Sequence, residues 1–396
     1  MRIDGALLEP RLDELYAIGA QPEGGAYRPL YGPAWAAAVD LVQKWMKDAG
    51  LETRRDAVGN LWGRAEGAGK AIVTGSHIDT VRHGGRLDGA LGIVAGLTAV
   101  QALLKDKGKP RRPLEVVAIC EEEGSRFATN FWGSQAITGS IDRIDADIAQ
   151  AMRERGLDPA KIATAARDDI DTFVELHIEQ GAVLESARTP LAVVSAIVGT
   201  AHLEVTVIGR PDHAGTTPMD LRLDALAGAA AMVQAVESIA KSLGKPAVAT
   251  VGKLAALPDQ INVVPGKVIF TVDLRHSDLV GRRALEERIR SLCATISQER
   301  RLGLAIRTLQ EKPPVAMHPD LRALLARAAR ECGVQATEMV SGAGHDAQIL
   351  AARCKVGMLF VPSIGGRSHC PEESTNPEHL RLGTEVLARA LELLAY

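Results

Sequence analysis

The chain has 396 residues, of which 46% are hydrophobic and 24% charged, and its formal net charge is −3. This composition is typical of a globular protein, and the mixed charge with a slight acidic excess argues against a nucleic-acid partner. The length exceeds that of one hydrophobic core, so we expect two domains or one domain with a large insertion. No apolar run reaches the ~18 residues of a membrane-spanning helix, so we expect no membrane partner.

Five scattered cysteines lack CxxC spacing, which argues against a disulfide framework and against a cysteine-built zinc site. The N-terminal segment carries acids where a secretion signal needs an apolar stretch. Both features predict a cytoplasmic protein.

The first clear element is a helix over residues 33–50, since Pro33 suits a helix start, apolar residues recur at helical spacing and Gly50 suits its end. Four short apolar runs follow, and polar side chains gather where each run ends. The runs alternate with helical stretches, so we expect an α/β fold with a mainly parallel sheet that is covered on both faces. Such sheets bind ligands at the carboxyl ends of their strands. The four runs span residues 71–79, 114–123, 173–181 and 356–363.

The pattern changes between residues 199 and 314. Two predicted helices there separate four strand-like segments in the order β-α-β-β-α-β, which is that of a ferredoxin-like α+β sandwich. This unit lies between the third and fourth apolar runs. We therefore expect a discontinuous catalytic domain, residues 1–198 and 315–396, around an inserted domain at 199–314.

The first polar strand end is the segment GSHIDTVRHGGRLDGALG, residues 75–92. His77 follows an apolar run, and Asp79 can hold the second imidazole nitrogen and so fix its tautomer. Asp88 lies on a glycine-rich turn, where the backbone can pass close to an ion. Taken alone, this segment is more commonly a solvated strand end.

The second strand end, EEEGSRF at residues 121–127, follows a run without polar alternation. Three consecutive acids at a buried strand end repel one another unless a cation or solvent relieves them, although a solvated cluster is the simpler explanation of most acid runs. Neighbouring side chains diverge, so one acid can ligate a metal while the next handles protons, as metal-assisted hydrolysis requires.

The last two strand ends each add a histidine. ELHIEQG contributes His177 and Gln180, and SIGGRSHCPEE contributes His369 on a glycine-rich loop. Either histidine alone would more often be structural. Four strand ends that all supply His, Asp or Glu together predict a metal site, and nitrogen and oxygen ligands without thiolate favour zinc, manganese or cobalt.

At these segments the sequence resembles the hydantoinase/carbamoylase family, which is related to the aminoacylase and carboxypeptidase-like di-zinc metallopeptidases. The family contains N-carbamoyl-L-amino acid hydrolases, allantoate amidohydrolases and β-ureidopropionases. The resemblance runs in order from about residue 24 to the C-terminus, and HAGTTPM with ELHIEQG points to the carbamoylase branch. The matching motifs are GSHIDTV, GGRLDGALG, EEEGSRF, ELHIEQG, DHAGTTPM, GHDAQ and SHCPEE.

The resemblance implies two divalent metal ions, with zinc expected first and manganese, cobalt or nickel as alternatives. Glu122 would be the general base and acid that hydrolyses a ureido or amide C–N bond, and Asp79 would stand behind His77. The five ligands would be His77 and His177 on one ion, Glu123 and His369 on the other, and Asp88 between the two.

The resemblance also implies that the inserted domain is the lid and dimerisation domain of a homodimer. There His213 would stabilise the oxyanion, while Asn262 and Arg275 would hold a small carbamoyl or ureido acid, Arg275 through its carboxylate. Gln180 would lie near the substrate and the second metal.

Several of these positions have simpler explanations. The segment around His213 can be a plain turn, and Arg275 can form an ordinary salt bridge, although a guanidinium is a natural partner for a carboxylate. His345 in GHDAQ receives no ligand role. His83 and Arg367 stand where the family resemblance implies VPN-like and GGI-like sequences, and both can change the charge of the pocket and hence the choice of substrate.

Two rival functions stay open. One is a dipeptidase or N-acyl-amino-acid deacylase with the same metal centre, and the other is a binding protein on the same fold. The complete ligand set with Glu122 argues against a binding protein. N-carbamoyl-L-amino acids, allantoate and 3-ureidopropionate all remain candidate substrates, because they share a ureido group and a carboxylate.

Overall fold

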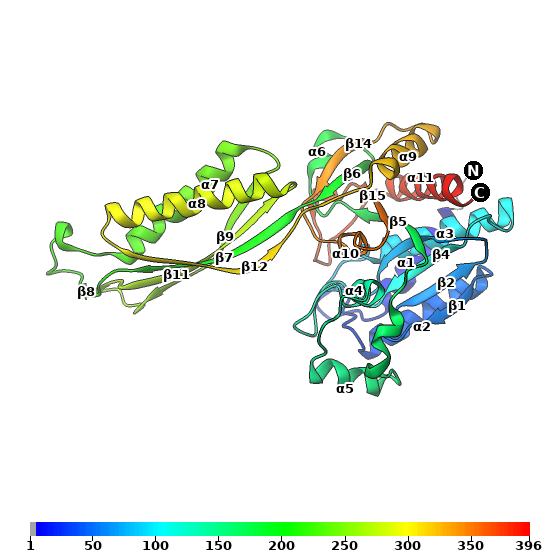
Figure 1. Ribbon diagram of the computed structural model, residues 1–396, viewed down its shortest axis with the longest axis horizontal. Coiled ribbons are helices and arrows are strands. Elements are labelled where there is room, and N and C mark those ends of the chain that lie inside the picture. The colour runs from blue at the N-terminus through cyan, green and yellow to red at the C-terminus, as the bar shows by residue number, and fades with distance from the viewer. Residues whose placement is uncertain (1–4) are drawn as a thin grey trace. The chain divides into compact units, whose positions relative to one another are not determined.

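The computed structural model describes residues 5–396, with side chains from residue 7 onward. Residues 1–4, which begin the N-terminal segment discussed above, lie outside that range. The chain forms two compact units (Figure 1), one built from the segments up to Ser195 and from Met317 to Tyr396, the other from Ala196–Ala316. Among the described helices, none has both the length and the apolar character of a membrane span.

The larger unit is built on one mixed sheet. Its strands are β1 (Glu52–Arg55), β2 (Leu61–Ala65), β3 (Ala71–His77), β4 (Leu114–Ile119), β5 (Ile170–Ile178), β6 (Ala192–Ile197), β14 (Thr337–Ser341) and β15 (Lys355–Val361). They lie in the order β1-β2-β4-β3-β5-β15-β6, β14 also pairs with β6, and the two-residue strand β13 (Val315–Ala316) follows β6 at the edge of the sheet. The central neighbours β4, β3, β5 and β15 are parallel, whereas β1, β2 and β6 are antiparallel to their partners.

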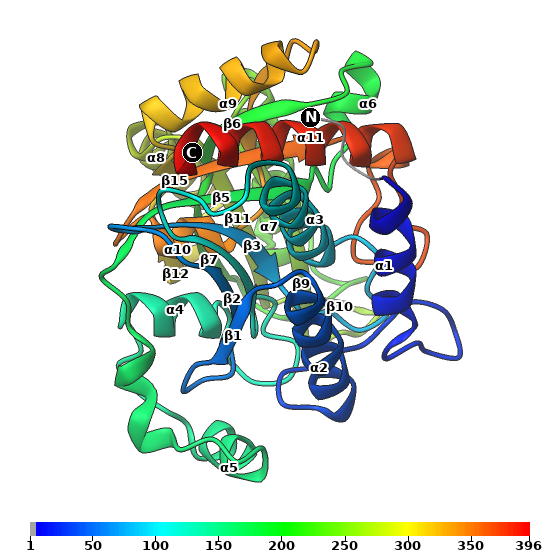
Figure 2. The ribbon, with the colours of Figure 1, turned by 90° about the vertical axis from the view of Figure 1, so that its right-hand side faces the viewer.

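Helices cover both faces of this sheet. The helices of this unit are α1 (Gly5–Ala17), α2 (Pro33–Asp48), α3 (Ala90–Lys107), α4 (Trp132–Thr138), α5 (Ala146–Glu154), α6 (Val183–Ala187), α9 (Pro319–Glu331), α10 (Asp346–Leu350) and α11 (Pro377–Ala395), with short 3₁₀ turns at Pro159–Ala165 and Ile364–Gly366. Figure 2 shows α2, α3 and α11 on one side of the sheet and α4 and α10 on the other. Because both faces are covered, β3, β4 and nearly all of β15 are buried, which explains their continuous apolar sequences. The α/β fold with a parallel sheet centre is therefore confirmed.

The smaller unit is a four-stranded antiparallel sheet with two helices on one face. Its elements are β7 (Gly199–Ile208), β8 (Asp212–His213), a 3₁₀ turn (Met219–Leu221), α7 (Ala225–Leu243), β9 (Val248–Leu257), β10 (Val263–Val264), β11 (Lys267–His276), α8 (Leu279–Glu299), β12 (Gly303–Lys312) and β13 (Val315–Ala316). The sheet order is β12-β7-β11-β9, and β8 with β10 forms a separate two-stranded ribbon.

The alternation of buried and more exposed side chains along its strands explains why this sheet needs only one layer of helices. In β7 every second side chain is buried, namely Ala201, Leu203, Val205 and Val207, and these residues pack in one core with apolar side chains of α7 and α8. The opposite face is at least partly exposed. This period of two contrasts with the continuous apolar runs of the larger unit.

Candidate metal centre

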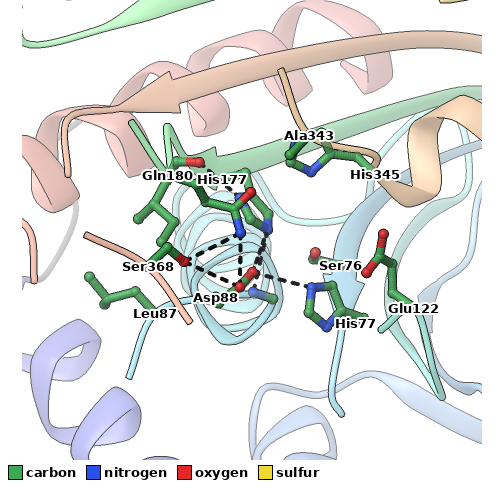
Figure 3. A network of polar contacts seen from close by, with 12 residues as sticks. Ser76, His77, Leu87, Asp88, Glu122, His177, Gln180, Ala343, His345 and Ser368 are labelled. Atoms are coloured by element: carbon green, nitrogen blue, oxygen red, sulfur yellow. Dashed lines mark hydrogen bonds and ion pairs between the residues drawn. The ribbon is translucent and has the colours of Figure 1, made fainter. Parts of the chain in front are cut away.

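The carboxyl ends of the four parallel strands meet at one edge of the sheet, and the predicted ligands meet there. His77 ends β3, His177 lies near the end of β5, Glu123 follows β4 and His369 follows β15. Asp88 lies just before α3, and Figure 3 shows it between His77 and His177.

Asp88 is the residue that all three histidines face. Its Oδ1 lies 3.4 Å from His77 Nε2 and 3.1 Å from His177 Nε2, while its Oδ2 lies 3.1 Å from His369 Nε2. On the Oδ2 side, Glu123 Oε1 lies 3.4 Å from the same His369 nitrogen. The two oxygens of one carboxylate thus face two different groups of donors.

The two buried histidines are oriented through their second ring nitrogens. His77 Nδ1 lies 3.3 Å from Asp79 Oδ1, and His177 Nδ1 lies 2.9 Å from the carbonyl oxygen of Ile178. A hydrogen bond donated from Nδ1 places the proton on that nitrogen and leaves the lone pair on Nε2. In both residues Nε2 faces Asp88, which is the arrangement that metal-binding histidines adopt.

The glycine before α3 lets this geometry form. Gly89 has a φ of 66°, and a Cβ built there would lie 2.4 Å from the carbonyl oxygen of His77 and 2.5 Å from its ring. Any other residue would push the start of α3 away from the end of β3.

The acidic loop after β4 gives its three carboxylates three different surroundings. Glu121 turns back to accept hydrogen bonds from the backbone N–H groups of Gly124 and Trp132. Glu122 and Glu123 have ligand atoms within 4.8 Å of one another and of a His77 ring nitrogen. Glu121 thus diverges from its two neighbours, whereas Glu122 and Glu123 lie close together, and the division of roles between these two stays a prediction.

Asp79 joins two strand ends. Besides facing His77, its Oδ1 accepts a hydrogen bond of 3.0 Å from the backbone N–H of Glu122, and its Oδ2 accepts one of 3.3 Å from that of Glu123. Asp79 is fully buried. One carboxylate therefore fixes both a predicted ligand and the backbone that carries the predicted base.

The electrostatics of the site fit divalent cations. Burial and repulsion by Glu123 raise the pKa of Glu122 well above its usual value, and burial and repulsion by Asp88 raise the pKa of Glu123 to about 7. Although burial opposes the ionised form of Asp88, the facing imidazole rings of His177, His369 and His77 lower its pKa well below the usual value. Crowded buried carboxylates of this kind need positive charge, and a donor set of nitrogen and oxygen atoms suits divalent ions.

One cation of the chain lies beneath these acids. Arg28 is 1% exposed and donates hydrogen bonds to the carbonyl oxygens of Ile78, at 2.9 Å, and Leu15, at 3.3 Å. Burial lowers its pKa to about 10, while the nearby carboxylates of Asp79 and Asp88 act in the opposite direction. A guanidinium with that pKa stays charged at neutral pH and offsets part of the local negative charge.

Gln180 lies beside the bridging position. Its amide nitrogen donates to Asp88 Oδ2 at 2.9 Å and lies 3.3 Å from Ser368 Oγ and 3.4 Å from His369 Nε2. Gln180 and His369 both have left-handed backbones, with φ of 59° and 56°. Such backbones are disfavoured for residues other than glycine and tend to occur at functional sites.

In the smaller unit, His213 and Asn262 are brought together by the β8–β10 ribbon. Val263 pairs with His213, and the carbonyl oxygen of Asn262 accepts a hydrogen bond of 3.0 Å from Ala214. His213 Nδ1 accepts hydrogen bonds from the backbone N–H groups of Gly215 and Thr216. The ring proton of neutral His213 must therefore be on Nε2, which leaves an exposed N–H donor.

Arg275 lies at the other end of the same unit. The ribbon adjoins the start of β11 at Lys267, whereas Arg275 is eight residues further along this strand, or about 27 Å away at the usual rise per residue. Its guanidinium pairs with Asp273, at 3.1 Å from Nε and 2.9 Å from Nη2. The salt bridge considered from the sequence is thus present, and Arg275 is not grouped with His213 and Asn262.

The two departures from the family motifs are engaged in local contacts. His83 Nδ1 lies 3.0 Å from the carbonyl oxygen of Gly24. Arg367 Nη2 lies 3.0 Å from Glu372 Oε2, so the charge of Arg367 is partly offset on its own loop. His345, which received no ligand role, packs edge-on against His177 with ring centroids 4.6 Å apart.

Known proteins match this chain over most or nearly all of its length. Residues 73–393 match the model of peptidase family M20/M25/M40. The chain is 41% identical to an allantoate amidohydrolase of Escherichia coli (strain K12), over 98% of each chain. It is also 41% identical to an N-carbamoyl-L-amino-acid amidohydrolase of Paenarthrobacter aurescens, over 98% of this chain and 97% of that one.

Solved structures give the same result. The crystal structure of an amidase of the hydantoinase/carbamoylase family from Burkholderia multivorans matches with a TM-score of 0.93 at 35% identity, and covers 100% of this chain and 98% of that chain. The resemblance seen in the sequence motifs is therefore confirmed. The chain belongs to peptidase family M20/M25/M40.

Proposed function

We propose that this protein is a metal-dependent amidohydrolase that cleaves the ureido C–N bond of a small carbamoyl or ureido acid. The observation that carries the proposal is Asp88, whose two carboxylate oxygens face separate groups of predicted ligand side chains. Full-length relatives named as allantoate and N-carbamoyl-L-amino-acid amidohydrolases support the reaction class. The allantoate, carbamoyl amino acid and 3-ureidopropionate activities remain alternatives within that class.

Two divalent ions would be held by the five ligand side chains, one by each histidine-containing group, with Asp88 shared. When bound, the ions supply Lewis acidity that polarises the scissile carbonyl and acidifies the attacking water. Zinc is the first expectation, and manganese, cobalt or nickel would accept the same donors. The ligand atoms would be on His77 and His177, on Glu123 and His369, and on Asp88.

Glu122 would carry the proton in this reaction. Its carboxylate lies within 4.8 Å of that of Glu123 and of a His77 ring nitrogen, and it is not one of the five predicted ligands, so it can accept a proton from the attacking water. The same proton then passes to the leaving nitrogen, and an N-carbamoyl amino acid yields ammonia, carbon dioxide and the amino acid. Asp79 contributes by holding the backbone of residue 122 in place.

The smaller unit would bind the substrate and act as a lid and dimerisation domain. The Nε2–H of His213 is a suitable donor to the developing oxyanion, with Asn262 beside it, and Arg275 would bind the substrate carboxylate. One small acid cannot contact both ends of a strand that places them about 27 Å apart. We therefore propose a homodimer in which one copy supplies Arg275 and its partner supplies His213 and Asn262.

A further feature supports such a dimer. Strand β9 lies at an edge of its sheet and exposes large apolar side chains, with Val248 51%, Leu254 45% and Leu257 46% accessible. An exposed apolar edge strand readily pairs with another chain.

Mixing two inactive variants tests the shared site. The variants H213A and R275A, refolded or co-expressed together, should regain about a quarter of wild-type activity, because half of the dimers are mixed and each mixed dimer has one intact site. No recovery on mixing would show that both residues act within one copy.

A substrate panel tests the reaction class. The protein is stripped of metal and reloaded with zinc, manganese, cobalt or nickel, and initial rates are measured. Ammonia release from N-carbamoyl-L-amino acids, allantoate or 3-ureidopropionate supports the proposal. Faster amine release from dipeptides or N-acyl amino acids would favour the dipeptidase or deacylase alternative, and metal binding without any turnover would favour a binding protein.

A further inference from the structure

Glu373 is a buried carboxylate that connects the two loops of the metal centre. Its Oε1 accepts hydrogen bonds from the backbone N–H groups of Leu87, at 2.7 Å, and Asp88, at 3.0 Å. Its Oε2 accepts a hydrogen bond of 2.6 Å from the hydroxyl of Ser368, next to His369. A single side chain thus contacts the backbone of the bridging residue and the neighbour of a predicted ligand.

The carboxylate packs directly against the first of these loops. A Cβ built on Gly85 would lie 2.2 Å from the carboxyl carbon of Glu373, so only a glycine at residue 85 leaves room for it. Glu373 is 4% exposed, and it is the one buried residue in the loop 364–373. Gly85 on one loop therefore leaves the space that the buried carboxylate of Glu373 on the other loop fills.

His369 is the ligand that most needs such support. Its side chain is 50% exposed, compared with 3% for His77 and 1% for His177, and its backbone is left-handed. The other two histidines belong to central strands, whereas His369 belongs to an exposed loop. The loop is also held at Gly365, whose backbone N–H donates to Glu185 Oε2, but that contact lies four residues before His369 in the chain, whereas Ser368 adjoins it.

Ser368 extends the contact toward the site. Its hydroxyl donates to Glu373 and lies 3.4 Å from Asp88 Oδ2, and the amide of Gln180 lies 3.3 Å from it. A hydroxyl has one proton, and the 2.6 Å contact gives that proton to Glu373. The lone pairs of the hydroxyl are then directed toward Gln180, whose amide also donates to Asp88.

From these contacts we infer that Glu373 is a positioning residue, which sets the distance between His369 and Asp88 without binding a metal itself. The inference rests on the ligand set of the proposed function. Groups that orient metal ligands from behind typically contribute about 10- to 100-fold to metal affinity.

The test is a zinc titration of the metal-free full-length protein in competition with a chromophoric chelator. E373Q keeps the size of the side chain but replaces one of its two acceptor oxygens by an NH2 donor, so it cannot accept hydrogen bonds both from the backbone N–H groups of Leu87 and Asp88 and from Ser368. We expect it to weaken one of two zinc equivalents by about 10- to 100-fold. The control is E372Q on the same loop, whose side chain is 60% exposed and pairs with Arg367. This variant should match the wild type.

A second variant approaches the same contact from the other side. S368A removes the hydroxyl and should weaken the same zinc equivalent, so the test does not depend on the folding of E373Q. Thermal unfolding of the metal-free variants is measured in parallel. A residue that only supports the fold would lower the melting temperature and leave both zinc affinities unchanged, and that result would overturn the inference.

H369A separates this inference from the proposed function. It should abolish the zinc equivalent that E373Q weakens. If H369A keeps both equivalents at wild-type affinity, the ligand set itself is wrong. If H369A loses one equivalent while E373Q and S368A keep both, the ligand set stands and the positioning role of Glu373 fails.

Discussion

Replacing Glu123 with glutamine should have opposite effects on the metal-free and the zinc-loaded protein. Burial and the Asp88 carboxylate raise the pKa of Glu123 from 4.5 to about 7. Between those two pH values the folded metal-free protein binds more protons than the unfolded chain, so its stability falls as the pH rises through this window. Above about pH 7 this loss of stability is complete. A pKa rise of that size corresponds to about 3 kcal/mol of unfolding free energy.

Glutamine stays neutral at every pH, so the E123Q variant avoids this loss of stability. At pH 8 in a chelator, E123Q should therefore unfold at a temperature about 5 °C above that of the wild type, given the usual entropy of unfolding for a domain of this size. At pH 5 the wild-type carboxyl is already protonated in the folded state, and the difference should shrink to about 1 kcal/mol or less. In saturating zinc the order should reverse, because the variant lacks a ligand.

Differential scanning calorimetry at the two pH values, with chelator or zinc, measures all four conditions. The exposed E372Q variant serves as the control, since no buried charge is removed. If E123Q melts at or below the wild-type temperature in chelator at pH 8, the ionised carboxylate does not destabilise the empty site and the reasoning is refuted.

Four further substitutions test other parts of the molecule. E122Q should bind zinc normally in a titration but lower kcat by about 100- to 10,000-fold, and normal turnover would remove its role as base. R28M should lower the free energy of unfolding in urea by about 3 kcal/mol, because buried carbonyl acceptors lose their donor, whereas a loss below about 0.5 kcal/mol would contradict that view. G89A should weaken zinc binding at least about tenfold, since the added Cβ would clash with the predicted ligand His77. Wild-type affinity would show that α3 can shift freely. R275K should raise KM about tenfold with little change in kcat, because a single ammonium replaces a bidentate guanidinium. An unchanged KM would show that Arg275 does not bind the substrate carboxylate.

The meeting of strand ends could be predicted from sequence, because it depends on local pattern and on the rule that parallel strands end at one edge. The places of His77, His177 and the glutamates of residues 121–123 at strand ends could be predicted from the apolar runs, whereas the separate roles of Glu122 and Glu123 were implied only by the family resemblance. The separate task of Glu121 could not be predicted, since it depends on which way a loop turns. Glu373 was equally hidden, although it lies in the quoted motif SHCPEE, because its backbone partners Leu87 and Asp88 are 286 and 285 residues away in the chain.

The contacts of Asp79 have a consequence for how the site can change over time. Asp79 holds main-chain N–H groups of residues 122 and 123, not their side chains. Substitutions at these two positions therefore leave the loop anchored where it is. The support of the loop is therefore separate from the chemistry of its side chains, and other ligands or proton carriers can be placed at this strand end without rebuilding the backbone contacts beneath them.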